Sequence, residues 1–133
     1  MGAIALGMVS TAAAADVVIR ISKYRQTMYV YVDGYLERMW AVSTGRWGYS
    51  TPEGSYRPTS LDASHRSGRY GGAPMPYAIF FHGGYAIHGS YDVDRLGEPA
   101  SHGCIRLHPR NASELYNLVR DYGPEDTTII VSY

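Results

Sequence analysis

The chain has 133 residues, of which 12 are lysine or arginine and 12 are aspartate or glutamate, so its formal net charge at pH 7 is zero. Charges of one sign do not cluster along the sequence, and the basic surface that binding to nucleic acid or an anionic membrane requires is missing. We therefore expect neither as a partner, and the length suits one domain with a single core.

The first 15 residues differ in composition from the rest of the chain. An apolar run, Ala3 to Val9, is followed within a few positions by four consecutive alanines, which is typical of the end of a secretory signal peptide. No basic residue precedes Arg20, so the basic start of such a signal is missing, and a disordered or tag-like terminus is the alternative. The run is far shorter than the ~20 apolar residues that cross a bilayer. We predict a signal-peptide remnant at 1–15, a single domain at 16–133 without a membrane span, and export to the periplasm or cell envelope.

Three apolar-rich runs at the start of the domain predict strands at Val17 to Ile21, Met28 to Val32 and Tyr35 to Val42. Only Asp33 and Gly34 separate the second run from the third. Asp-Gly between two such runs is a strong signal for a two-residue hairpin turn. The domain is therefore predicted to begin with β-structure that includes a tight hairpin.

The middle of the chain, Tyr49 to Pro74, is rich in glycine, serine and proline. We predict a long loop there, with one short strand at Gly54 to Pro58, and long ordered loops in compact domains are commonly lids or binding loops. Beyond this segment, Tyr77 to Phe81 and Tyr85 to His88 are predicted strands, joined by a tight turn at the two glycines between them.

The C-terminal part of the chain predicts one helix and a final strand. Asn111 can cap a helix over Ala112 to Arg120, with Glu114 in the capping-box position, and Gly123 followed by proline ends it. Thr127 to Ser132 is the last predicted strand. No repeat of 20 to 50 residues is visible. Together the elements predict a mainly β fold, a sandwich or barrel of mixed strands with one packed C-terminal helix.

Cys104 is the only cysteine of the chain, so packing, metal binding or reactivity must explain it. It lies one residue after Gly103, and His88, His102 and Arg106 are candidates to lower the pKa of its thiol and so supply thiolate. Glycine also allows the backbone to point amide groups at a developing oxyanion. The segment therefore predicts a nucleophile, and the alternative is a cysteine that packs as a small hydrophobic residue.

A metal site is the second alternative, because imidazole and thiolate are ligands that zinc prefers. The spacings of the candidate ligands match none of the common zinc patterns, so we expect thiol catalysis without a metal or other cofactor. The candidate ligands are His82, His88, His102, Cys104 and His108.

The run Ser101 to His108, together with the upstream Ala86-Ile87-His88-Gly89, resembles the signature of the L,D-transpeptidases, the YkuD-type catalytic domains of bacterial cell-wall enzymes. In that family a histidine-glycine pair precedes a serine-histidine-glycine-cysteine run, which an aliphatic residue and commonly an arginine follow. The likeness extends to Thr51-Pro52-Glu53-Gly54, to Pro74-Met75-Pro76-Tyr77 and to the helix region 111–119. The resemblance implies a YkuD-like β-sandwich for most of the chain after residue 16.

The same resemblance implies a role for each residue of the catalytic group. Cys104 would be the nucleophile, and His88 the general base that takes the thiol proton. A backbone carbonyl, here that of Gly89, would hold His88 in its tautomer, while His102 would support the site by tuning the thiolate or orienting the loop. The alternative for His88 is a structural histidine with satisfied hydrogen bonds.

Four further residues complete the predicted site. Ser101 would bond to a histidine or brace the turn, and Gly103 with Cys104 would offer backbone N–H groups to the oxyanion. Arg106 and Tyr85 are the candidate substrate-binding residues, since a guanidinium suits the carboxylates of a cell-wall stem peptide. An internal salt bridge is the alternative role for Arg106.

The implied reaction is a two-step acyl transfer on peptidoglycan stem peptides. Cys104 would form an acyl-enzyme with a tetrapeptide stem and release D-alanine, and an amine of a neighbouring stem, or in some family members of an envelope protein, would then accept the acyl group. Water as acceptor would make the same site an L,D-carboxypeptidase or amidase-type hydrolase. A non-catalytic wall-binding module, whose 13 tyrosines stack on glycan, is the hypothesis from another class.

Overall fold

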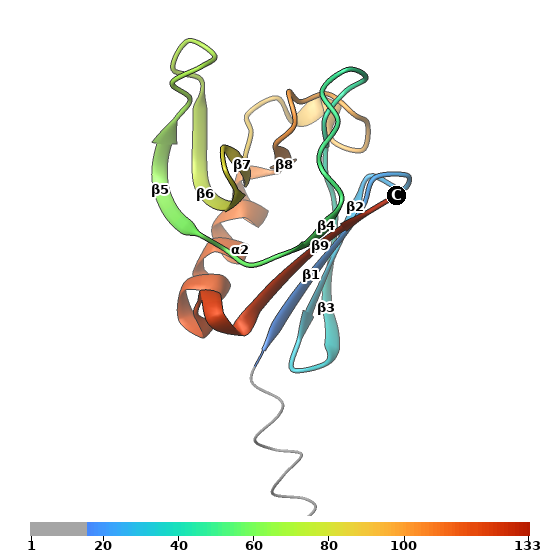
Figure 1. Ribbon diagram of the computed structural model, residues 1–133, viewed down its shortest axis with the longest axis vertical. Helices are drawn as coiled ribbons and strands as arrows, with labels where there is room; N and C mark the ends of the chain where they lie inside the picture. Colours follow the sequence, from blue (N-terminus) through green and yellow to red (C-terminus); the bar gives the residue numbers. More distant parts are fainter. Residues whose placement is uncertain (1–15) are drawn as a thin grey trace, which may run out of the picture.

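The computed structural model describes residues 16–133, and the signal-peptide remnant predicted at 1–15 lies outside the described residues. Within the described part, nine strands form a five-stranded and a four-stranded sheet, with one α-helix and two short 3₁₀-helices (Figure 1). This arrangement confirms the predicted mainly β fold with one packed C-terminal helix. The elements are β1 (Val17–Ser22), β2 (Thr27–Val32), β3 (Tyr35–Ala41), β4 (Gly54–Tyr56), β5 (Ser60–Arg66), β6 (Pro74–His82), β7 (Tyr85–Gly89), η1 (Val93–Arg95), β8 (Ile105–Leu107), α2 (Pro109–Tyr122), η2 (Pro124–Asp126) and β9 (Thr127–Ser132).

The five-stranded sheet has the order β3-β2-β1-β9-β4. β1 runs antiparallel to β2 and parallel to β9, so the last strand of the chain lies beside the first (Figure 1). In β1, Val17, Ile19 and Ile21 are buried while Arg20 is exposed, which is the alternation expected when one face of a sheet covers a core.

Both predicted glycine-containing turns are confirmed. Asp33 and Gly34 have φ values of +52° and +87°, as a two-residue hairpin turn of type I′ requires at both positions. At the second turn, His82 pairs with Tyr85 across two glycines, and Gly83 has a φ of +54°. Each turn therefore joins two antiparallel strands.

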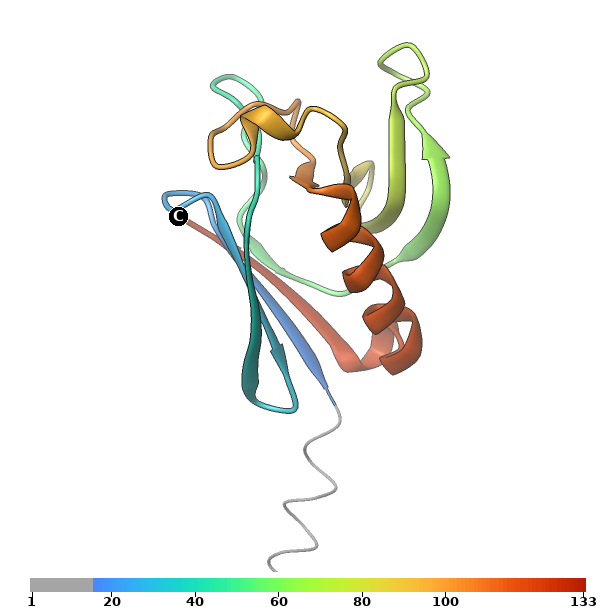
Figure 2. The ribbon, with the colours of Figure 1, turned by 180° about the vertical axis from the view of Figure 1, so that it is seen from behind.

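The four-stranded sheet has the order β5-β6-β7-β8, with β7 and β8 parallel and the other neighbours antiparallel. The β5–β6 hairpin extends beyond the rest of this sheet (Figure 2). β5 lies within the segment 49–74, so the prediction of a long loop with one short strand is wrong here. β5 has no apolar pattern because it is an edge strand with mostly exposed side chains, and its backbone pairing with β6 holds it.

The helix packs against β6 and β7 and closes the hydrophobic core, which also contains side chains of β1, β2 and β9 (Figure 2). Ala112, Leu115 and Val119 are the buried residues of α2, and their spacing of three and four positions puts them on one helical face. In residues 16–133, no helix is long and apolar enough to cross a membrane.

The predicted helix start is wrong. α2 begins at Pro109, and its N-cap is His108, whose side chain accepts a hydrogen bond from the backbone N–H of Arg110. Proline fits the first helical position because the N–H it lacks would have no partner there. Asn111 is therefore inside the first turn, and Glu114 pairs with a β3 arginine at 2.7 Å rather than forming a capping box.

Candidate active site

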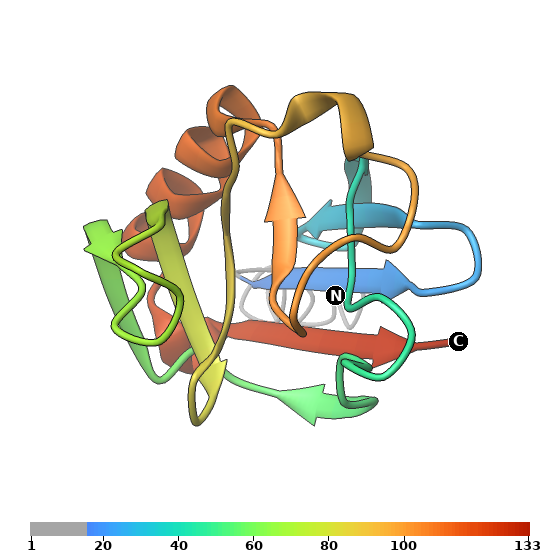
Figure 3. The same ribbon diagram turned by 90° about the horizontal axis from the view of Figure 1, so that it is seen from above.

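Cys104 is the residue immediately before β8, and His88 lies in the neighbouring strand β7. The two strands are parallel, with Ile87 opposite Ile105 and His88 opposite Arg106. The register therefore brings the two halves of the sequence signature together. β8 was not predicted, because three residues are too few to show a period. Seen from above, β8 and the loop before it lie between the β5–β6 hairpin and the loop after β3 (Figure 3).

A cleft of about 610 Å³ opens at this place. Cys104, His88 and Arg106 line it from the four-stranded sheet, and Tyr85 joins them from the start of β7. Tyr70 lines it from the turn of the β5–β6 hairpin. The cleft is large enough for a segment of a peptide. Six of the predicted site residues line it, since His102 and Ser101 join Cys104, His88, Arg106 and Tyr85.

His88 is almost fully buried, with 6% of its surface exposed. Its Nδ1 lies 2.6 Å from the carbonyl oxygen of Gly89, and since a carbonyl can only accept, Nδ1 donates the hydrogen. In a neutral ring Nε2 then carries the lone pair. The pKa of His88 is lowered from 6.5 to about 4, chiefly by burial. The hydrogen bond to Gly89 raises this pKa, whereas the positive charges of Arg106 and His65 lower it. His88 is therefore neutral at pH 7 and able to accept a proton.

The thiol of Cys104 differs from the expectation. Burial raises its pKa, and this outweighs the opposite effects of a backbone hydrogen bond from Ala86 and of the Arg106 charge. The Sγ atom lies 3.8 Å from the carbonyl oxygen of Gly84, to which a neutral thiol can donate. At rest the cleft thus contains a protonated thiol and a neutral imidazole, and the sequence-based prediction that neighbouring residues supply a resting thiolate is wrong.

The turn before Cys104 is held from within. The hydroxyl of Ser101 donates to the carbonyl oxygen of Cys104 at 2.5 Å and accepts from the N–H of Gly103 at 3.0 Å. Ser101 therefore braces the turn, and the Gly103 N–H is engaged rather than offered to an oxyanion. Gly103 has a φ of +126°, and a Cβ there would lie 2.6 Å from the ring of Tyr85. Glycine is required at this position both by conformation and by the close approach of that ring.

The same turn is held from outside by Thr51, for which the sequence offered a family resemblance but no role. Thr51 is fully buried, and its hydroxyl donates to the carbonyl oxygen of Gly103 at 2.7 Å and accepts from the N–H of Gly45 at 2.9 Å. A Cβ at Gly45 would overlap the carbonyl oxygen of Tyr49, so this position also requires glycine. The loop after β3 and the nucleophile turn are thus joined through one hydroxyl group.

Lys23, at the end of β1, holds the backbone around Thr51 in turn. Its ammonium group donates to the carbonyl oxygen of Thr51 at 2.8 Å and to the hydroxyl of Ser50 at 2.9 Å, and it pairs with the carboxylate of Glu53 at 3.3 Å. Only 14% of its side chain is exposed. The loop that supports the nucleophile turn is therefore fixed to the five-stranded sheet.

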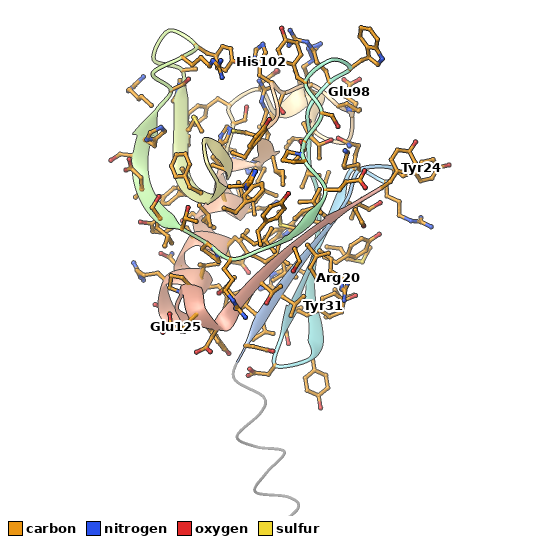
Figure 4. The ribbon with its side chains drawn as sticks, viewed as in Figure 1. Arg20, Tyr24, Tyr31, Glu98, His102 and Glu125 are labelled. Carbon is orange, nitrogen blue, oxygen red and sulfur yellow. The ribbon has the colours of Figure 1, made fainter. Side chains whose placement is uncertain are left out.

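His102 lies between two tyrosines from different loops. Its ring stacks on Tyr70 with centroids 4.2 Å apart and meets the edge of Tyr49 at 4.9 Å. Figure 4 shows His102 at the upper end of the molecule, between the β5–β6 hairpin turn and the loop after β3. The pKa of His102 is lowered, mainly by partial desolvation and to a smaller extent by the positive charges of Arg46 and Arg106. His102 thus joins the two rims of the cleft, a contact that sequence spacing could not reveal.

Arg106 faces the cleft and has an acidic partner. Its guanidinium lies 3.5 Å from the carboxylate of Asp92, with 21% of the arginine side chain exposed. Asp92 also lines the cleft. The geometry supports the internal pairing considered for Arg106, and it leaves the guanidinium facing the space that a substrate would enter. Across residues 16–133, no three His, Cys, Asp or Glu side chains are grouped to hold a metal ion.

Comparison with known proteins gives one family and a set of solved structures. A family model for the L,D-transpeptidase catalytic domain, YkuD, matches residues 16–131. An L,D-transpeptidase from Mycobacterium smegmatis has a TM-score of 0.78 at 26% sequence identity. The match covers 89% of this chain and 59% of that protein. One from Mycobacterium tuberculosis H37Rv has a TM-score of 0.78 at 29% identity, with 57% of its length and 88% of this chain covered.

A third structure is L,D-transpeptidase 3 from Mycobacterium tuberculosis in complex with a faropenem-derived adduct. It has a TM-score of 0.77 at 26% identity, with 60% of its length and 88% of this chain covered. The chain thus spans less than two thirds of the solved structures that it matches. No curated protein gave a significant match.

Proposed function

This chain belongs to the L,D-transpeptidase catalytic domain family, and from that premise we propose that it is a cysteine acyltransferase acting on peptidoglycan in the bacterial cell envelope. The family is one of transferases of the cell wall, and the matched region includes every predicted site residue. We further propose that the protein reaches the wall by export to the periplasm or cell envelope. The remaining steps concern how the cleft would carry out the transfer.

The observation that carries the proposal is that one cleft holds an imidazole able to accept a proton, that of His88, and a thiol able to give one up, that of Cys104. The imidazole is neutral with Nδ1 bound to the Gly89 carbonyl, so its remaining nitrogen is free to accept a proton. The thiol is protonated in the resting state, so attack requires a base. In the first step His88 takes the thiol proton while Sγ attacks the carbonyl between the L-centre of the diamino acid and D-alanine.

The tetrahedral intermediate then collapses. The proton on His88 passes to the nitrogen of the departing D-alanine, and the C–N bond breaks to leave a thioester on Cys104. In the second step an amine from a neighbouring stem, or from an envelope protein, attacks the thioester and restores the thiol. The product is a cross-link between the third residues of two stems, or a protein attached to the wall. Such a sequence predicts ping-pong kinetics.

The decisive experiment is intact-mass analysis of the protein mixed with a tetrapeptide-bearing wall fragment. We expect an adduct with the mass of the donor minus D-alanine, and we expect Cys104→Ala to lack it. Cys104→Ser is the matched variant, since it replaces only the thiol by a hydroxyl group. Absence of the adduct from the unaltered protein would contradict the proposal, and binding that Cys104→Ala leaves unchanged would favour a wall-binding module.

The same experiment separates transfer from hydrolysis. With an amine acceptor present, a transpeptidase converts the adduct to a cross-linked product, whereas a hydrolase releases the free tripeptide whether or not the amine is added. The ratio of these two products therefore measures which reaction the cleft favours.

A further inference from the structure

A second histidine with a fixed tautomer lies in the cleft and has no role in the mechanism above. Nδ1 of His65 is 3.0 Å from a carboxylate oxygen of Asp62, on the same strand β5. Because a carboxylate only accepts, Nδ1 donates the hydrogen and the lone pair of a neutral ring lies on Nε2. His65 therefore has the same proton arrangement as His88, with a carboxylate in place of a carbonyl.

Packing brings His65 close to the nucleophile. Its ring meets the ring of Phe80 edge-on with centroids 4.9 Å apart. Phe80 in turn packs, together with Cys104, against the small cluster of Met75, Ala78 and Ala86 on the cleft side of the four-stranded sheet. His65, Phe80 and Cys104 all line the same cleft. One aromatic ring and the open cleft thus separate the second histidine from the thiol.

The separation of the two histidines suits a substrate group between them. His65 is on β5 and His88 on β7, with β6 between. Adjacent strands lie ~4.8 Å apart, and the register adds an offset along the strands, because His65 pairs with Met75 whereas Ile87, next to His88, pairs with Ile79. The two backbones are therefore more than ~10 Å apart. The charge of His65 nevertheless reaches His88, whose pKa it lowers. The two rings therefore line one cleft and are too far apart to be a directly bonded pair.

The second step of the transfer must remove two protons from the acceptor nitrogen, and the leaving sulfur takes up only one of them. The side-chain amine of an acceptor stem has a pKa of ~10 and arrives as an ammonium ion at neutral pH. An ammonium ion has no lone pair and cannot attack a thioester. A base beside the entering amine must first remove one proton.

We propose that His65, oriented by Asp62, is the general base that deprotonates the acceptor amine, an inference that rests on the proposed function. One proton of the ammonium passes to Nε2 of His65, and the free amine attacks the thioester carbon of acylated Cys104. A second proton leaves the nitrogen through His88 to the sulfur as the C–S bond breaks. The new amide is formed and the neutral thiol of Cys104 is regenerated. The side chain of His65 is 31% exposed, so it returns its proton to solvent.

The charges around His65 fit this role. Asp62 stabilises the imidazolium that forms, and Asp92 faces the cleft from the loop after β7 and attracts a cationic acceptor. The other titratable or charged groups that line the same space are Arg69, Tyr70, Tyr85, His88, Tyr91, His102, Cys104 and Arg106. Arg106 is paired with Asp92 at 3.5 Å, so its repulsion of an ammonium ion is reduced.

The test follows the two half-reactions separately in the full-length protein. The acyl-enzyme is first formed with a tetrapeptide donor and quantified by intact mass. A stem peptide with a free diamino-acid side chain is then added, and the loss of the adduct is measured over a range of pH. The variants are His65→Gln and Asp62→Asn, with Ser64→Ala as the control, an exposed neighbour on β5 that does not line the cleft.

We expect His65→Gln to form the adduct at the rate of the unaltered protein and to lose it to the amine about 10²-fold more slowly at pH 7. The deficit should shrink as the pH approaches ~10, where the acceptor loses its proton to solvent. Asp62→Asn should show a smaller loss of the same kind, and Ser64→Ala none.

Equal loss of both half-reactions at every pH would show that His65 is only structural, and unchanged aminolysis would also overturn the inference. If the unaltered protein forms no adduct at all, the proposed function itself fails. Normal acylation with normal aminolysis in His65→Gln would instead overturn only the role of His65.

Discussion

Cys104 and His88 are both held in their neutral forms by the same physical cause, which is removal from water. Burial disfavours any charged form, so it raises the pKa of the acidic thiol and lowers the pKa of the basic imidazole. The two shifts move in opposite directions and together prevent a resting thiolate–imidazolium pair. In the proposed reaction, charge on these groups would then develop only when a substrate carbonyl is attacked.

This arrangement predicts a slow and strongly pH-dependent reaction of Cys104 with a small alkylating reagent. Iodoacetamide should modify the thiol more slowly at pH 7 than it modifies a free cysteine, and the rate should keep rising above the ordinary thiol pKa, because burial raises the pKa of Cys104. Intact mass after timed quenching measures the rate. A fast reaction that does not change between pH 6 and 8 would mean that a thiolate is present at rest.

At the scale of elements, the nucleophile turn is positioned by a loop that lies far from it in sequence. The loop after β3 reaches the turn through the Thr51 hydroxyl, and it bonds from the N–H of Arg46 to the carbonyl oxygen of Ser101 at 2.9 Å. Neither contact is with the thiol itself. They fix the backbone from which the thiol projects, and small displacements of a reacting group are costly to catalysis.

Thr51→Val tests this support because valine keeps the shape and loses the hydroxyl. The Gly103 carbonyl and the Gly45 N–H would lose their buried partner, so we expect the free energy of unfolding to fall by about 1–3 kcal/mol. The rate of adduct formation should fall by up to about 10²-fold. Thr51→Ser keeps the hydroxyl and should retain most of both. Equal behaviour of the two variants in denaturant unfolding and acylation would remove the hydroxyl from the explanation.

The comparison of predicted and observed elements shows which signals a single sequence carries. Asp33-Gly34 was predictable because a turn with positive φ at both positions has few compatible residues. The β5 strand was not, since its backbone pairing leaves no trace in mostly polar, exposed side chains. The helix start was missed because a histidine side chain at His108 caps α2, a residue type outside the usual capping set.

Some residues of the candidate site could likewise be predicted from the sequence, and others could not. Cys104, His88 and Gly89 lie close together in the sequence signature, so a motif could find them and the fold needed only to join two strands. Thr51 contacts Gly103 in a segment far away in the chain, and His65 meets Phe80 on the next strand. No local pattern distinguishes either residue from other polar loop or strand residues. The direction of the thiol pKa depends on burial, which the sequence around Cys104 does not contain.

At the scale of the whole molecule, the cleft rests on both sheets. β8 belongs to the four-stranded sheet, and Arg106 on it exchanges two backbone hydrogen bonds with Ser43, in the segment that leaves β3, at 2.8 and 3.1 Å. β7 and α2 meet behind His88, where a Cβ at Gly89 would lie 3.1 Å from the backbone of Pro109. The burial of His88 is therefore a property of the complete fold.

Global stability should then depend on the protonation of His88. The folded protein keeps this ring neutral down to a pH of about 4, the value of its pKa, whereas the unfolded chain protonates it near 6.5. The unfolded state binds more protons between these values, so stability falls as the pH falls through this window, by about 3 kcal/mol at most. Denaturant unfolding at pH 7 and pH 4.5 measures the loss.

The matched variant is His88→Gln, in which this part of the pH dependence should disappear, although its stability at pH 7 will differ. His82→Gln, at an exposed position, serves as the control and should keep the slope. A slope that survives in His88→Gln would assign the acid sensitivity to other groups.

The environment of Lys23 has a consequence if the protein transfers acyl groups to amines, as proposed above. It is the only lysine of the chain, and its ammonium is occupied by two hydrogen bonds and one ion pair. An acyl-enzyme that met a second copy would find no accessible lysine on the described surface, and modifying Lys23 would require breaking the anchor of the supporting loop. The thioester of the proposed acyl-enzyme would thus react with amines of other molecules rather than acylate Lys23 of a second copy.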